Sequence, residues 1–166
     1  GGMEILPVQG ERGLSIVGAG ADVTRIKFSK GSALSAGQYI AFSIKPSVLP
    51  TVGVYANYLS DISVSGIGFY DDDPSTHVGA DESHGVAIAY AKNVSVKDCT
   101  FLDIGDECVN YQEVVRGIVD GNISVNSPSV GEFGGPISIT SGCQGIVIEN
   151  NVLYGSDTIG TRSIVV

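Results

Sequence analysis

Short runs of alternating apolar and polar residues recur along the whole chain, and this recurrence limits the fold more than any other feature. Each run is followed, one turn later, by a second such run. Period-two alternation is typical of strands, and self-similarity at roughly 20–50 residues is typical of solenoids. The sequence therefore predicts an all-β solenoid of about five or six coils. The first runs begin at Met3, Gln38, His84, Glu107, Gly135 and Arg162, and the second runs span Leu14–Phe28, Asp61–Phe69, Asn93–Phe101, Gly117–Val125 and Gly145–Tyr154.

Size and composition fit a single domain over residues 1–166, which is either complete or a piece of a longer protein. A hydrophobic content of 43% excludes a disordered chain. The 23 glycines suit a β protein with many tight turns. No window shows the apolar spacing of an amphipathic helix. Two polar stretches, Lys45–Ser60 and Asp71–Ser83, are too long for simple turns, and in a solenoid such insertions map to one face.

The net charge of −9 argues against a nucleic-acid partner, because phosphate binding needs a basic surface. No apolar run reaches membrane-spanning length, so we expect no membrane insertion. The three cysteines are Cys99, Cys108 and Cys143, with no Cys-x-x-Cys pair. We expect them to be buried thiols that serve as small apolar side chains.

Aligning the strands by parity predicts which side chains stack. Successive strands of a parallel solenoid lie about 4.8 Å apart. The alignment predicts an outward column of mostly small residues, which would form a shallow groove. The predicted inward pairs are Val86 and Ile88, Val109 and Tyr111, Ile137 and Ile139, and Ile164 and Val166. The column before the strands is Gln38, His84, Glu107, Gly135 and Arg162, and the outward column is Ala41, Ala87, Asn110, Ser138 and Val165.

The coil pattern resembles the right-handed parallel β-helix of the pectin-lyase-like superfamily, and within it the polygalacturonases. The match includes Gly105-Asp106-Glu107-Cys108 and Arg162-Ser163-Ile164 at places where that family carries catalytic motifs. The resemblance implies a glycoside hydrolase or, less directly, a polysaccharide lyase. It also implies an extracellular location, although no signal peptide is visible in the sequence.

The chain departs from that family at three catalytic positions. The family's first catalytic Asp corresponds to His84, its His to Gly135 and its Lys to Ile164. The resemblance assigns the catalytic role to Asp106, Glu107 and His84, with one of the two acids as general acid. Glycoside hydrolysis needs two carboxylates about 6.5–9.5 Å apart when the product is inverted. A second carboxylate would have to come from Asp81, Glu82 or Asp103, or His84 would act as the base.

His84 stacked beside Glu107 is the sharpest predicted constellation. A carboxylate one strand away would orient the imidazole and suit acid–base chemistry. The alternative is a hydrogen-bonded pair at a surface turn. The predicted substrate-binding residues are Arg162, Asn110, Ser138 and Gln38, with Arg162 suited to a sugar carboxylate or else to a salt bridge.

The acidic stretch after Phe69 suits a calcium ion, which prefers six to eight oxygen ligands. The candidate ligands are Asp71, Asp73 and Asp81. The alternative is a solvated acidic loop. No other cofactor is expected.

Two functions from different classes therefore remain open. One is a protein that binds or cleaves a uronate-containing oligo- or polysaccharide. The other is a non-catalytic β-helix module for adhesion or assembly, such as a phage tail fibre or surface protein. Because the strand at Arg162–Val166 would leave the solenoid uncapped, we also expect a homo-oligomer through the C-terminal coil.

Overall fold

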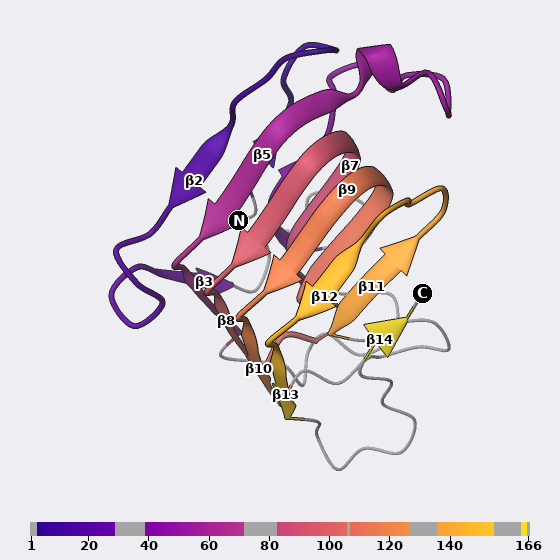
Figure 1. Cartoon of the computed structure of the whole chain (residues 1–166). Helices are drawn as coiled ribbons and strands as arrows, with labels where there is room; N and C mark the ends of the chain where they lie inside the picture. The colour runs from indigo at the N-terminus through magenta and orange to yellow at the C-terminus, as the bar shows by residue number, and fades with distance from the viewer. Residues whose placement is uncertain are drawn as a thin grey trace.

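The computed structural model describes residues 3–28, 39–71, 83–105, 107–126, 136–154 and 164–165. Within these ranges the chain is all-β, with one short 3₁₀ turn, η1 (Tyr55–Asn57). The strand pairs within them are parallel, so the prediction of an all-β fold built from parallel strands is confirmed (Figure 1). The strands are β1 (Met3–Ile5), β2 (Ser15–Val17), β3 (Arg25–Phe28), β4 (Tyr39–Ile44), β5 (Leu59–Ser65), β6 (Gly68–Asp71), β7 (Ser83–Lys97), β8 (Thr100–Leu102), β9 (Val109–Asp120), β10 (Ile123–Val125), β11 (Ile137–Thr140), β12 (Val147–Glu149), β13 (Val152–Tyr154) and β14 (Ile164–Val165).

The described strands form a large and a small sheet, which face each other across the core. The large sheet has nine strands in the order β1-β4-β7-β9-β11-β14, with β2, β5 and β12 attached beside this path. The small sheet has five strands in the order β13-β10-β8-β6-β3. The long strands β7 and β9 bend midway, so that each contributes two segments to the large sheet (Figure 1).

The core is made of stacked apolar side chains, as the parity alignment predicts. Val86 pairs with Val109, which pairs with Ile137, and all three are at most 2% exposed. Ile88 and Tyr111 form the next buried layer, together with Ile139. Only one residue of the remaining predicted pair is described. Ile164 pairs with Ile137, and Val166 lies outside the described residues.

The predicted register of β4 was wrong by two residues. Ile40, not Gln38, pairs with His84, and Ser43, not Ala41, pairs with Ala87. Gln38 itself lies outside the described residues. A shift of two residues keeps every side chain on its own face, so alternation cannot distinguish the two registers.

Tight corners separate the strand segments, and several adopt the left-handed backbone conformation. One column of such corners contains Asp61, Asn93 and Arg116, with φ between 52° and 61°, and continues at Gly145 with φ 63°. Asp and Asn tolerate this conformation better than most residues. The corners stack because each follows strand residues that pair with one another.

The cysteines lie where the sequence predicts small apolar side chains. Cys99 and Cys108 are buried, Cys143 is half-buried, and all three are free thiols. Burial raises the pKa of the Cys99 thiol from 9.0 to about 11. A group whose pKa is higher in the folded than in the unfolded protein contributes stability that is fully present below its pKa in the unfolded protein. This contribution is lost as pH rises through its pKa in the folded protein.

We therefore expect Cys99 alone to lower the free energy of unfolding by about 2 kcal/mol as pH rises from about 9 to about 11. Urea unfolding across this range measures the fall. In the Cys99→Ala variant the fall should be smaller by about this amount, with a residual part from Tyr58, Tyr111 and Cys143, whose pKa values burial also raises. An equal fall in the variant would show that Cys99 does not cause it.

Candidate functional site

The structure describes five of the residues that the sequence predicts for a site: His84, Glu107, Asn110, Ser138 and Asp71. The others lie outside the described residues; they are Asp106, Arg162, Gln38, Asp73 and Asp81. Glu82 and Gly135, which enter the same predictions, also lie outside.

A local break in alternation places His84 and Glu107 on the outer side of the large sheet. Gly85 and Val86 are both buried, and so are Cys108 and Val109. A Cβ on Gly85 would lie 2.4 Å from the ring of Phe101, on the core side. The residue before each such pair therefore points away from the core, toward the side that also carries Ala87 and Asn110.

His84 and Glu107 form an ion pair between Nδ1 and a carboxylate oxygen, so their predicted juxtaposition is confirmed. Their side chains are only 7% and 11% exposed. The pair is therefore not on the surface, and its catalytic role stays a prediction. An imidazole and a carboxylate in contact are side chains of the kind that general acid–base catalysis uses.

A groove lies along the outer side of β7 and begins at His84. Its floor is Ala87 and Ala89, whose small side chains lie between longer ones on the neighbouring strands. Ala87 pairs with Ser43 and Asn110, and Ala89 pairs with Gln112. The groove has a volume of about 210 Å³ and is lined by Ile40, Ser43, Ile44, Lys45, His84, Ala87, Ile88, Ala89, Asn110 and Gln112.

The predicted shallow groove is thus present, with one difference in its lining. Ser138 is next to Asn110 across the sheet, but it is fully buried and does not line the groove. Within the described part of the chain its hydroxyl oxygen has no hydrogen-bond partner. Lys45 and Gln112, which the sequence did not single out, supply polar groups in its place.

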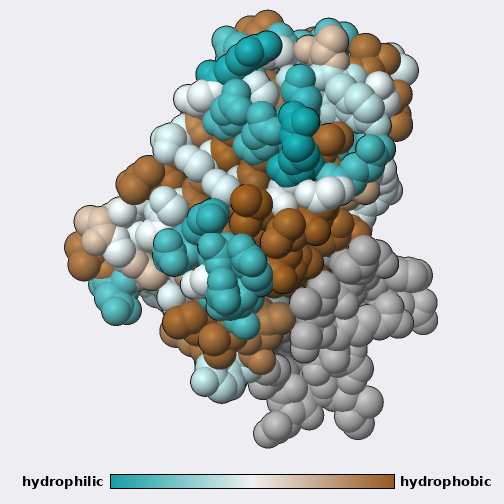
Figure 2. All heavy atoms as spheres, in the orientation of Figure 1, coloured by the Kyte–Doolittle hydropathy of each residue, from teal (hydrophilic) through white to brown (hydrophobic). Residues whose placement is uncertain are grey.

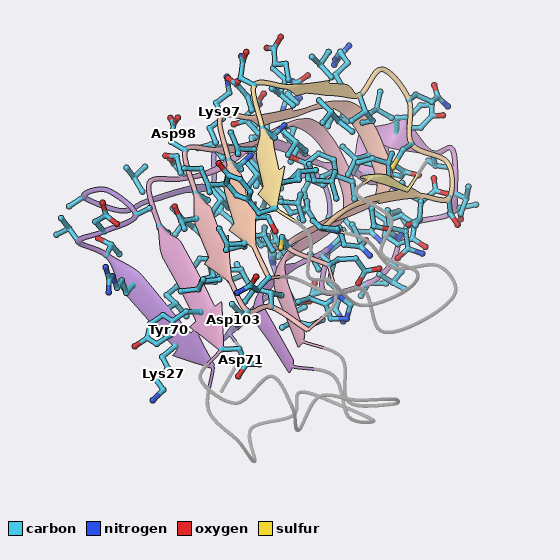
Figure 3. The ribbon with its side chains drawn as sticks, turned by 90° about the horizontal axis from the view of Figure 1, so that it is seen from below. Lys27, Tyr70, Asp71, Lys97, Asp98 and Asp103 are labelled. Atoms are coloured by element: carbon cyan, nitrogen blue, oxygen red, sulfur yellow. The ribbon has the colours of Figure 1, made fainter. Side chains whose placement is uncertain are left out.

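Two carboxylates lie at neighbouring strand ends of the small sheet, and one of them is the predicted calcium ligand Asp71. Tyr70 pairs with Leu102, and Asp71 and Asp103 are the residues that follow them. Figure 3 shows both acids at the same end of the sheet, with Lys27 and Tyr70 beside them. Among the described residues no group of three or more His, Cys, Asp or Glu side chains could hold a metal ion.

A second buried polar cluster was missed from the sequence. Tyr58 donates its hydroxyl hydrogen to Glu113, at 2.9 Å, and both residues are buried. Burial raises the pKa of the Tyr58 phenol, and the hydrogen bond to Glu113 raises it further. The ring of Tyr58 packs edge-on against Tyr55 and Tyr90. Glu113 gave no signal in the sequence because its corner interrupts the alternation between Tyr111 and Val114.

Comparison with protein-family models, with curated proteins and with solved structures finds no match for this chain. No helix in the described parts of the chain has the length and hydrophobicity to cross a membrane.

Proposed function

We propose that this protein binds an oligosaccharide in the groove along β7. The observation that carries the proposal is the row of Ala87 and Ala89 between the polar side chains of Ser43, Asn110 and Gln112. A floor of small side chains leaves room for a sugar ring. The hydroxyl and amide groups on both sides of the floor can form hydrogen bonds with the hydroxyl groups of the sugar.

The finer architecture is part of the same proposal. We take the successive sets of parallel strands as coils of a right-handed parallel β-helix, about five or six in number. The sets β4-β5-β6, β7-β8, β9-β10 and β11-β12-β13 follow one another in the chain, and each pairs in parallel with the previous one. This repetition supports the resemblance to the pectin-lyase-like superfamily. That resemblance in turn supports a sugar as the ligand.

Lys45 supports an acidic ligand such as a uronate, since it lines the groove of a chain whose net charge is −9. Its ammonium group would attract a sugar carboxylate, whereas the overall charge would repel a polyanion from most other surfaces.

Hydrolysis of the bound sugar would use the His84 and Glu107 pair, of which His84 lines the end of the groove. Glu107 would act as general acid, and His84 would position it and exchange its proton. The base would be His84, or a second carboxylate from Asp81, Glu82 or Asp103. We expect weak turnover of plain polygalacturonate, because the family's catalytic His corresponds to Gly135.

A glycan array followed by a reducing-sugar assay tests this proposal. We expect acidic oligosaccharides to be retained, and the Glu107→Gln variant to lose at least 100-fold of any hydrolysis, as is typical for removal of an acid–base group. His84→Gln should lower the rate and change its pH profile. Retention of no glycan would refute the binding function, and full turnover by Glu107→Gln would place the chemistry elsewhere.

An assembly module is the second candidate, and the outer face of the small sheet favours it. Leu102, Ile123, Val152 and Tyr154 are 40–61% exposed there, on three adjacent strands. Hydrophobic residues also gather at the lower end of the view in Figure 2, where Figure 1 places β10 and β13. Exposed apolar patches of this kind often mark protein–protein contacts. A protein that binds no glycan but self-associates in light scattering, and loses this association on Tyr154→Ser, would support this candidate.

A further inference from the structure

A second pocket lies on the large sheet, on the strand segments that follow the corners of β7 and β9. It has a volume of about 470 Å³ and is lined by Asn93, Val94, Ser95, Lys97, Arg116, Gly117, Ile118, Gly145 and Val147. None of these residues lines the groove along β7. Figure 2 shows this face, with hydrophilic residues in two groups separated by weakly polar and hydrophobic ones.

The floor of this pocket is largely apolar. Ser95 pairs with Ile118, which pairs with Val147, so their side chains form one row across three strands. Their neighbours Val96 and Val119 are fully buried, which places this row on the outer side of the sheet. Val147 is 46% exposed. A row of this kind offers an apolar surface to the face of a sugar ring.

The rim is a chain of hydrogen bonds that orients Arg116. Asn93 donates through its amide nitrogen to Asp61, at 2.8 Å, and accepts from Nε of Arg116, also at 2.8 Å. This fixes one edge of the guanidinium. Among the described residues no acceptor is found for its two terminal nitrogens, so they are available to a ligand. Gly145, the next residue in the corner column, has no side chain and leaves room beside the backbone and Cγ of Arg116.

Basic residues gather around this pocket although the chain is acidic. Of nine Lys and Arg residues, four lie on or beside this face: Arg12, Lys92, Lys97 and Arg116. Lys97 is held by Asp120 at 3.2 Å, on the opposite rim from Arg116. Hydrogen bonds from Asn93 and Ser60 lower the pKa of Asp61, and the charges of Arg12 and Lys92 lower it further. Of these four, only Lys97 and Arg116 line the pocket, and Lys97 already has a carboxylate partner in Asp120.

We propose that this pocket binds the carboxylate of an acidic sugar, with the terminal nitrogens of Arg116 as bidentate donors and the Ile118 and Val147 row beneath the ring. A planar guanidinium matches the two oxygens of a carboxylate. The inference rests on the proposed binding of acidic oligosaccharides, and it assigns a second site that is separate from the groove along β7.

The test is a titration with galacturonic acid, a single ring that cannot span both pockets, followed through the backbone amide signals of Ser95, Gly117 and Ile118. We expect these signals to shift in the wild type and to need at least about tenfold more ligand in Arg116→Gln, the loss typical of a charge-assisted bond. Arg25→Gln makes the same charge change on the small sheet and should leave the titration unchanged. Galactose, which lacks the carboxylate, should cause much smaller shifts.

Four outcomes would overturn the inference: no shift at these amides, an equal response to galactose, equal effects of Arg116→Gln and Arg25→Gln, or loss of the response in Ala89→Tyr, which fills the other groove.

The same variants distinguish the second pocket from the proposed groove along β7. If Ala89→Tyr abolishes oligosaccharide binding and Arg116→Gln has no effect, the proposed function stands and the second pocket is refuted. If only Arg116→Gln matters, the second pocket stands and the groove along β7 is refuted.

Discussion

Replacing Phe101 with alanine is expected to lower the free energy of unfolding by about 3–5 kcal/mol, the usual cost of removing a buried phenylalanine. Phe101 is 1% exposed and stacks on Phe69 with ring centroids 5.0 Å apart. Phe69 in turn packs edge-on against Phe42, at 5.6 Å. The ring also fills the space that Gly85 leaves free, so the substitution opens a cavity between the two sheets.

The adjacent residue provides the control. Leu102 follows Phe101 on β8, points to the opposite face and is 40% exposed. Leu102→Ala should cost about 1 kcal/mol or less. Urea unfolding of both variants measures the difference. Equal losses would mean that the small sheet does not bury the face that contains Phe69 and Phe101.

Asn122→Ala is the second substitution with a large expected effect, a loss of about 3 kcal/mol. Asn122 is 3% exposed, and its side chain connects the corners that precede β8, β10 and β13. Its amide oxygen accepts from the backbone N–H of Cys99, and its amide nitrogen donates to the carbonyl of Val96 and to Asn151. Alanine would leave these buried groups without their partner, and unsatisfied buried polar groups are costly.

Asn57→Ala is the matched control, because Asn57 is exposed on the η1 turn. It should change the free energy of unfolding by no more than about 0.5 kcal/mol. Thermal or urea unfolding compares the two variants. If both substitutions lowered the free energy of unfolding equally little, the hydrogen bonds of Asn122 to Cys99, Val96 and Asn151 would not stabilise these corners.

Alternation in the sequence was enough to predict the parallel strands and most of the inward stacks. Val86, Val109 and Ile137 align because a buried face admits only registers that keep apolar residues inside. The same argument cannot choose between registers two residues apart, which is why Gln38 was placed beside His84 in place of Ile40. The register is decided by contacts between distant segments of the chain, and the local pattern carries no information about these contacts.

The candidate site could be predicted only in part, for a physical reason that particular residues show. The His84 and Glu107 pair follows directly from aligned strands, and the small residue Ala87 signals a groove. The burial of Ser138 and the pairing of Tyr58 with Glu113 depend on contacts between distant segments, which alternation does not report. Arg116 was missed because its importance comes from stacked corners, where Asn93 orients it, and not from any short motif.

The central claim is that an oligosaccharide lies in the groove over Ala87 and Ala89, and isothermal titration with tetragalacturonate tests it most directly. The comparison needs the wild type, the Ala89→Tyr variant and, as control, Ala56→Tyr on the exposed η1 turn. We expect binding by the wild type and by Ala56→Tyr, and at least tenfold weaker binding by Ala89→Tyr, which corresponds to about 1.4 kcal/mol. Equal affinity of all three proteins would contradict the claim.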